Sequence, residues 1–321
     1  MEMLAEKMDG ISVMKRVIIS LSLLSLMFSC AEKVVPEVQK PEIVEQGEYQ
    51  SVTMVIPPIS FDDEEPITKI NLDFGSLKYL WAEKDSVGIF PDLGSQIYFS
   101  MAEGVGQSVA TFDGGGWALK RGSSYYSYFP FVADYYIDKE AIPINFKGQV
   151  QDGNGNLASA SLGNHCFMVA KGEADEATGN LMFSYERLQM PFMFVIPVEA
   201  GTYTSLDVFA GDELIAVSGT MNAISLDKVI HDAVYDDHLT IGLKNVTFTK
   251  SETLVVTAML PPFDINGKQL TINLTKSDGT IVTSSAFGKT FALGKAYRNA
   301  PNFSVAPSQV DIPGDAGTFD I

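Results

Sequence analysis

A small number of side chains in this sequence have the types and spacing that chemistry requires. Asp152, Asn154 and Asn156 occupy the early ligand positions of an EF-hand loop, where their oxygen atoms could surround calcium. Leu157 then stands where such a loop needs glycine, and Gly163 where it needs a bidentate glutamate. The pattern therefore favours a loop between strands over a calcium site.

The histidines offer a second candidate chemistry. His231 and His238 enclose Asp232, Asp236 and Asp237, and imidazole together with carboxylate can bind zinc. No further strong ligand group can be assigned to this segment. A solvated polar loop is therefore the favoured interpretation.

A third candidate is the neighbouring pair His165 and Cys166, which could form an activated nucleophile. The run CFMVA that begins at Cys166 is apolar, so a buried and inert thiol is favoured. The glycines 114–116 lack the Lys and Ser/Thr of a phosphate loop and indicate a turn. Because no triad, acid pair or metal set emerges, we expect neither an enzyme nor a bound cofactor or metal.

The segment Met14–Cys30 points to a different reaction, the acylation of a thiol. A basic pair precedes an apolar core of about 12 residues, too short to span a bilayer, and a small serine comes directly before Cys30. This arrangement resembles a bacterial lipoprotein signal. We expect residues 1–29 to be a signal peptide, with residues 1–13 upstream of its true start, and Cys30 to be lipidated. An ordinary secretory signal cut nearby is the alternative.

Composition limits the partners of the chain. It carries 40 acidic and 22 basic side chains in 321 residues, a formal net charge of −18. Such a charge repels phosphate, so nucleic acid and anionic lipid headgroups are poor partners. No segment after residue 30 is apolar enough, for long enough, to span a membrane. We therefore expect contact with a membrane through the lipid anchor only.

The elements that must position these side chains are mostly strands. Residues 30–47 mix Pro, Glu, Lys and Val, as in a tether. Beyond them, short runs rich in Val, Ile, Thr and aromatic residues alternate with turn dipeptides such as Asn-Gly and Asp-Gly. Leu270, Ile272 and Leu274 alternate with polar residues, which indicates a hairpin strand. No run indicates a helix of three turns, so we expect an all-β fold.

The length indicates more than one domain. About 290 residues remain after the signal, which are too many for one ordinary core. A polar, glycine-punctuated stretch at residues 172–180 suggests a boundary. We expect an N-terminal β-sandwich over residues 48–178, a C-terminal β-sandwich over residues 179–301, and a final segment over residues 302–321.

Several segments, taken in order, carry a family resemblance. They are Trp81–Phe90 (WAEKDSVGIF), Tyr125–Phe131 (YYSYFPF), Cys166–Ala170 (CFMVA), Phe183–Pro197 (FSYERLQMPFMFVIP), Ala258–Phe263 (AMLPPF) and Phe291–Tyr297 (FALGKAY). Together they resemble the fimbrillin-like proteins of Bacteroidetes, the lipoprotein-derived subunits of type V pili. None of the segments is catalytic, and each fits sheet packing or turn chemistry.

The resemblance implies two transthyretin-like antiparallel β-sandwich domains in a lipoprotein on the outer surface of the outer membrane. It also implies assembly into a fimbrium with other copies or related pilus subunits, by strand exchange. A protease would remove the N-terminal strand, here near Tyr49–Ile56, and a neighbour's terminal segment would fill the groove. No arginine occurs between Cys30 and Lys120, so Lys69 is the candidate processing site. An uncleaved anchor or tip subunit is the alternative.

Residues 302–321 are the candidate donor segment. Prolines break this segment, so it cannot form one long strand in its own domain. Its alternating apolar residues Val310, Ile312, Phe319 and Ile321 could fill pockets in a neighbour's groove. An edge strand, a disordered tail and the start of a further domain are the alternatives.

Two functions remain in competition. The first is a structural and adhesive pilus subunit, with a host protein or glycan as its receptor. The second is a surface glycan-binding lipoprotein of a polysaccharide-uptake system. Exposure of Trp117, Tyr125 or Tyr128 on one shallow face would favour the second, whereas packing of Tyr125–Phe131 in a core would favour the first.

Overall fold

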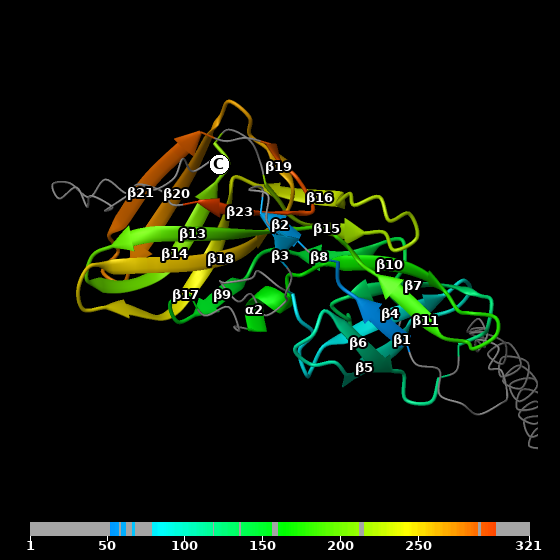
Figure 1. Cartoon of the computed structure of the whole chain (residues 1–321). Helices are drawn as coiled ribbons and strands as arrows, with labels where there is room; N and C mark the ends of the chain where they lie inside the picture. Colours follow the sequence, from blue (N-terminus) through cyan, green and yellow to red (C-terminus); the bar gives the residue numbers. More distant parts are fainter. Residues whose placement is uncertain are drawn as a thin grey trace, which may run out of the picture. The chain divides into compact units, whose positions relative to one another are not determined.

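Strands joined by turns make up almost all of the described chain (Figure 1). The computed structural model describes residues 52–57, 59–61, 66–67, 79–117, 119–134, 136–155, 160–211, 215–287 and 290–299, which all belong to one unit, residues 41–321. Within these ranges the only helix is α2 (Ala160–Gly163), of 4 residues. The prediction of an all-β fold is confirmed. No helix in the described part of the chain has the length and apolar character needed to cross a membrane.

The first half of the chain supplies most of an eight-stranded sheet. Its pairings are antiparallel except that of β1 with β11, which is parallel. At Gly172 an added Cβ would lie 2.7 Å from the carbonyl oxygen of Met182, so β10 and β11 nearly touch and the sheet curls back on itself. In order, the strands are β11 (Leu181–Ser184), β1 (Val52–Val55), β6 (Val109–Asp113), β5 (Ile97–Glu103), β4 (Ser86–Pro91), β7 (Ser124–Phe129), β10 (Met168–Glu173) and β12 (Glu186–Arg187).

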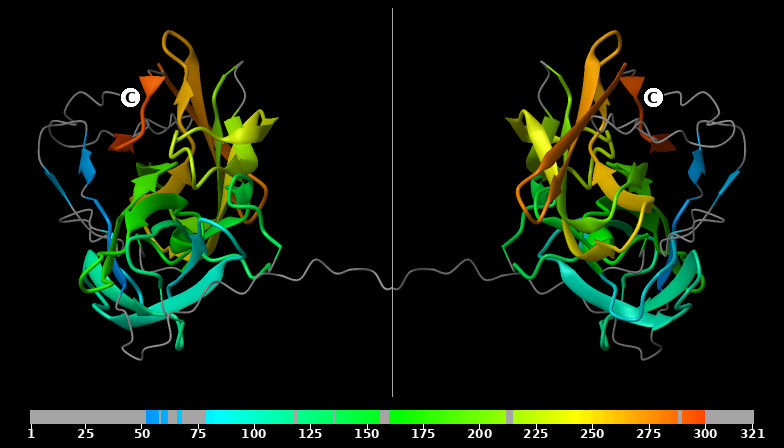
Figure 2. Two further views of the ribbon diagram at one scale, coloured as in Figure 1. Left: turned by 90° about the vertical axis from the view of Figure 1, so that its right-hand side faces the viewer. Right: turned by 90° about the vertical axis from the view of Figure 1, so that its left-hand side faces the viewer.

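Two five-stranded sheets form a sandwich, and most of their strands come from later parts of the chain. One contains, in order, β18 (Glu252–Leu260), β13 (Met190–Val198), β23 (Lys295–Asn299), β2 (Ile59–Phe61) and β3 (Pro66–Ile67). The other contains β21 (Ile281–Phe287), β20 (Gln269–Lys276), β14 (Gly201–Phe209), β17 (His238–Phe248) and β9 (Gln149–Asp152). The hairpin of β20 and β21, orange in both views of Figure 2, contains the predicted alternation, because Leu270, Ile272 and Leu274 are all buried.

Smaller sheets complete the fold. Three strands pair in the order β16 (His231–Asp236), β15 (Ile215–Met221) and β8 (Ile142–Asn145), and β19 (Phe263–Asp264) pairs with β22 (Thr290–Phe291). β8 and β9 precede the predicted domain boundary, yet they pair with β15 and β17 beyond it. β11 follows that boundary and pairs with β1. The two-domain division stays a prediction.

Two clusters of buried side chains hold the sheets together. The first core surrounds Trp81, whose ring meets those of Phe112, Phe129 and Tyr185 edge-on at 4.9, 5.4 and 5.9 Å between centroids. The second core lies between the two five-stranded sheets and includes Phe192 and many aliphatic residues. The strands of this sandwich also reach the first core, through Met193, Met259 and Ala296.

Side-chain amides cover the free edge of β18. In each contact the amide oxygen accepts a main-chain N–H of β18 at 2.8–2.9 Å, and the amide nitrogen donates to a main-chain carbonyl of β18 at 2.7–2.9 Å. The contacts join Gln149 to Met259, Gln151 to Thr257 and Val255, and Asn154 to Val255 and Thr253. Because an edge strand otherwise presents unpaired main-chain groups, this amide ladder of Gln149, Gln151 and Asn154 ties β9 to β18.

From the amide ladder we predict that Gln151→Leu lowers the stability of the fold. The substitution keeps a side chain of similar size but leaves the buried N–H of Thr257 without its acceptor. We expect the free energy of unfolding, measured by urea denaturation, to fall by about 1–3 kcal/mol. The matched control is Gln107→Leu at an exposed position, which should change the free energy of unfolding by less than about 0.5 kcal/mol. Equal stability of the two variants would contradict the role of the ladder.

Candidate functional site

Two of the residues with calcium-like spacing, Asp152 and Asn154, bond to neighbouring strands. Asp152 ends β9, and its Oδ1 accepts a hydrogen bond from Nδ2 of Asn245 at 2.8 Å. Asn154 binds the edge of β18 through both atoms of its amide. Asn156 and Leu157 lie outside the described residues. The polar side chains here tie the turn after β9 to β17 and β18, which is a structural role.

The adjacent histidine and cysteine do not form a nucleophilic pair. Nδ1 of His165 lies 2.9 Å from the carbonyl oxygen of Asn145, and Cys166 is fully buried. Nε2 of Gln189 donates to Sγ of Cys166 at 3.1 Å. Burial raises the pKa of the Cys166 thiol to about 12, so the thiolate that a nucleophile needs is disfavoured. The prediction of a buried thiol is confirmed.

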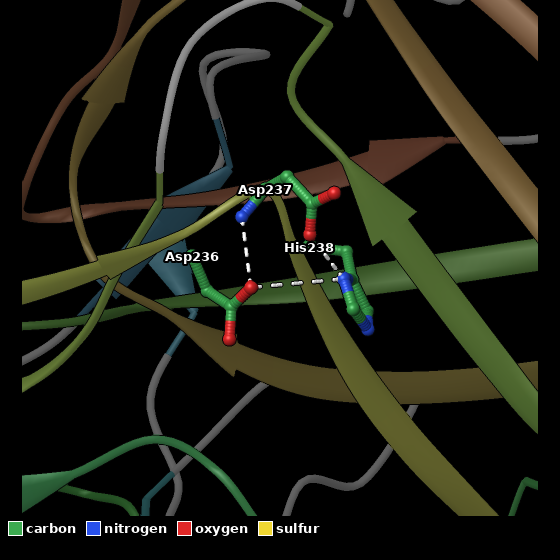
Figure 3. A group of neighbouring side chains, drawn as sticks. All are labelled: Asp236, Asp237 and His238. Atoms are coloured by element: carbon green, nitrogen blue, oxygen red, sulfur yellow. Dashed lines mark hydrogen bonds and ion pairs between the residues drawn. The ribbon is translucent and has the colours of Figure 1, made fainter.

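A group of possible metal ligands lies where β16 meets β17. Figure 3 shows Asp236, Asp237 and His238, with Nδ1 of His238 at 2.5 Å from Oδ1 of Asp237 and 3.9 Å from Oδ1 of Asp236. Their ligand atoms lie within 4.8 Å of one another. Nζ of Lys147 binds Oδ2 of Asp236 at 2.6 Å, so a lysine already neutralises one of the carboxylates. The arrangement fits an ion-paired surface corner.

His231, another member of the predicted histidine cluster, pairs outside this group. Nε2 of His231 is 2.9 Å from Oδ2 of Asp227, outside the predicted set. The ring of His238 stacks on Phe209 with 4.9 Å between centroids, which fixes its orientation. A structural zinc site takes four protein ligands. The residues that the structure describes bring only Asp236, Asp237 and His238 together, and Asp236 is already paired with Lys147.

The aromatic run packs into the cores instead of forming an open platform. Along β7, Tyr125 and Phe129 face the first core, and Tyr126 and Tyr128 face the second. Tyr125 is 4% exposed and Tyr128 0%, whereas Trp117 is 37% exposed. Core packing of this run is therefore confirmed. The tyrosines that would have favoured a glycan-binding face are buried.

The most unusual local arrangement is the position of β1. This strand, from near the start of the chain, pairs with β6 on one edge and with β11 on the other. In Figure 1 it is the blue strand among the later strands of the eight-stranded sheet. Further main-chain bonds extend the pairing: Ile56 donates to Ser108 at 2.9 Å, and Tyr185 donates to Val55 at 3.1 Å. An N-terminal strand thus occupies the interior of a sheet.

Side chains also hold β1 in place. Val52 and Met54 are fully buried in the first core. Nε1 of Trp81 donates to the carbonyl oxygen of Met54 at 3.4 Å, and the hydroxyl of Tyr185 lies 3.4 Å from Sδ of Met54. β1 is thus enclosed by the strands β6 and β11 and by the side chains of Trp81 and Tyr185. We call these four elements together the β1 seat.

The same N-terminal segment reaches a second sheet. β2 pairs with β23 in parallel, matching Ser60 with Lys295, and with β3 in antiparallel fashion. Residues 52–67 therefore contribute strands to both the eight-stranded sheet and the sandwich. β23, their partner, is the last strand in the described part of the chain.

Several predicted site residues lie outside the described residues. They are Cys30, Lys69, Val310, Ile312, Phe319 and Ile321. Their roles stay predictions. Sequence reasoning did not single out Trp81 and Tyr185 as contacts of the first strand. Both occur in segments that carry the family resemblance, but local spacing gives no sign of which distant strand they contact.

Comparison with known proteins identifies the fold. No protein-family model and no curated protein matches the chain. Among solved structures, a candidate cell adhesion protein from Bacteroides ovatus ATCC 8483 matches with a TM-score of 0.53 and 11% identity, over 80% of this chain and 96% of its own. This chain therefore shares that protein's fold, and the resemblance indicated by the sequence has a counterpart in three dimensions.

Two further structures are similar to a lesser degree. One is a candidate cell adhesion protein from Bacteroides uniformis ATCC 8492, with a TM-score of 0.48 and 13% identity over 78% of this chain and 91% of its own. The other is a fimbrial assembly protein from Parabacteroides distasonis ATCC 8503, with a TM-score of 0.37 and 11% identity over 79% of this chain and 90% of its own.

From the β1 seat we predict that substitutions at Met54 and Thr53 lower the free energy of unfolding by different amounts. Met54→Ala removes a fully buried side chain, and we expect it to lower the free energy of unfolding by about 2–4 kcal/mol. Thr53→Ala alters the opposite, half-buried face of the same strand and should cost less than about 1 kcal/mol. Thermal and urea unfolding of both variants measure the difference. Similar losses would show that the seat does not depend on the Met54 side chain.

Proposed function

We propose that this chain is a structural and adhesive subunit of a cell-surface pilus, that it belongs to the fimbrillin-like family, and that subunits join by strand exchange. The observation that carries the proposal is the position of β1, an N-terminal strand paired on both of its edges. The fold shared with a candidate cell adhesion protein of Bacteroides supports it.

Loss of β1 would leave a groove that must be refilled. β6 and β11 would each expose a row of main-chain groups, and the Trp81 and Tyr185 side chains would lose their contacts with Met54. Unpaired main-chain groups and exposed apolar side chains both cost free energy. A strand from another subunit removes both costs at once, as in other cases of β-strand addition.

Cleavage after Lys69 would release this segment as a whole. Lys69 follows β3 closely in sequence, so a cut there separates β1, β2 and β3 from the rest of the chain. The absence of arginine between Cys30 and Lys120 excludes arginine-specific cleavage before the first described sheet. A chain that stays uncut would serve as an anchor or tip subunit, because its own β1 keeps the groove filled.

The incoming strand is assigned to residues 302–321 of a neighbouring subunit. Val310 and Ile312, and again Phe319 and Ile321, are spaced to place two side chains on one face of a sheet. In the vacated groove they would take the places of Val52 and Met54. The partners are therefore other copies of this chain or related pilus subunits.

Export as a lipoprotein completes the proposal. Lipidation of Cys30 would hold the precursor at the outer membrane until its strand is exchanged, and the mature subunit would stand in a fimbrium on the cell surface. A host protein or glycan is the receptor class that such a fimbrium would meet. The alternative of a glycan-uptake lipoprotein is supported by the exposed Trp117 alone, because Tyr125 and Tyr128 are buried.

Deleting residues 302–321 tests the donor role. We expect the shortened chain to fold as a monomer with an unchanged melting temperature, because its β1 seat is intact, but to be absent from surface polymers. Polymers are scored as ladders on SDS gels and by electron microscopy with antibody against the chain. Normal ladders from the shortened chain would refute the donor role, and an unfolded monomer would indicate an edge strand instead.

Replacing Cys30 tests the anchor. Cys30→Ala removes the thiol that would be acylated, so we expect the protein to move from the membrane fraction to the soluble fraction of exported proteins. Cys166→Ala is the matched control, because that thiol is buried and its removal should leave the membrane fraction unchanged. Unchanged membrane association of Cys30→Ala would contradict lipidation at this residue.

A further inference from the structure

A buried arginine lies near the point where the chain leaves β1. Arg187, in β12, is 6% exposed. No carboxylate of a described residue forms an ion pair with its guanidinium, and the adjacent Glu186 instead pairs with Lys228 at 2.8 Å between Oε2 and Nζ. A charge removed from water is costly unless it is paired. Among the residues that the structure describes, this cation thus lacks the counter-charge that would normally accompany it.

The contacts of this guanidinium leave part of its bonding capacity unused. Nη2 donates to the carbonyl oxygen of Pro57, and the group lies 4.8 Å over the ring of Tyr79. Within the described ranges, no acceptor bonds the buried Nε of Arg187, and no donor bonds the buried Oε1 of Gln189. A neutral carbonyl is a weaker partner for guanidinium than a carboxylate, which can accept two parallel hydrogen bonds. The site could thus bind a stronger acceptor than the one it has.

Departure of β1 would remove that acceptor. Pro57 follows β1 closely and precedes β2, so it leaves with the N-terminal segment. The hydroxyl of Tyr79 lies 3.4 Å from Sδ of Met259, in β18, and this contact keeps the ring in place. What remains is a guanidinium beside an aromatic ring, at one end of the vacated groove.

We infer that Arg187 selects the strand that replaces β1, by binding a carboxylate on the incoming strand. This inference rests on the strand exchange proposed above. The occupant is residues 302–321 of a second copy, which carry Asp311, Asp315 and Asp320. The chain has a net charge of −18, so most of its surface repels these carboxylates, whereas the end of the groove attracts them.

A double-mutant cycle on the full-length chain tests this pairing. The variants are Arg187→Gln, the joint change of Asp311, Asp315 and Asp320 to Asn, and the combination of both. The measurement is the rate at which surface polymers dissociate in SDS at fixed temperature. We expect each change alone to speed dissociation by about 10- to 100-fold. The combination should be no faster than either alone, because both changes remove the same interaction.

Controls separate this inference from the proposed function. Arg121→Gln removes the same charge at an exposed position and should leave the rate unchanged. If the asparagine variant dissociates at the wild-type rate, carboxylate selection is wrong although strand exchange stands. If the wild-type chain forms no polymers, strand exchange fails and the inference fails with it. If Arg187→Gln does not fold, the asparagine variant alone tests carboxylate selection, because its substitutions leave the β1 seat untouched.

Discussion

Main-chain pairing on both edges of β1 is the interaction on which the rest of the structure depends. A strand inside a sheet satisfies the hydrogen-bonding groups of two neighbours, and β1 does so for β6 and β11. The same strand places Val52 and Met54 in the first core. Its removal therefore costs hydrogen bonds and apolar burial together.

The edge of β18 is satisfied by side chains and not by a further strand. β18 ends its sheet, and its main-chain groups bind the amide ladder of Gln149, Gln151 and Asn154. These amides reproduce the donor and acceptor pattern of a strand while remaining part of a distant segment. Because the edge is already satisfied, it offers no template for a strand from another molecule. The strand exchange that we propose at the β1 seat would therefore meet no competing association at β18.

The two cores are physically linked. Met193, Met259 and Ala296 lie on strands of the sandwich but pack in the first core. Met259 also contacts Tyr79, whose ring lies under the Arg187 guanidinium. The end of the β1 seat is therefore built partly by the C-terminal strands. Under the proposed strand exchange, these contacts would help the groove to keep its shape while its strand is replaced.

The sequence by itself determined the strand content, the alternation of Leu270, Ile272 and Leu274, and the burial of the Tyr125–Phe131 run. These features follow from local spacing, because side chains of a strand alternate between two faces. The resemblance carried by ordered segments also indicated the fold.

Only the tertiary structure decided which strands become neighbours. The parallel pairing of β1 with β11 joins segments as distant as Met54 and Tyr185, which are 131 residues apart. The contact of Arg187 with Pro57 and the amide ladder span similar distances along the chain. A spacing pattern fixes which face of a strand is buried but not which partner covers it. That choice depends on how whole faces pack together, and packing is a property of the assembled fold.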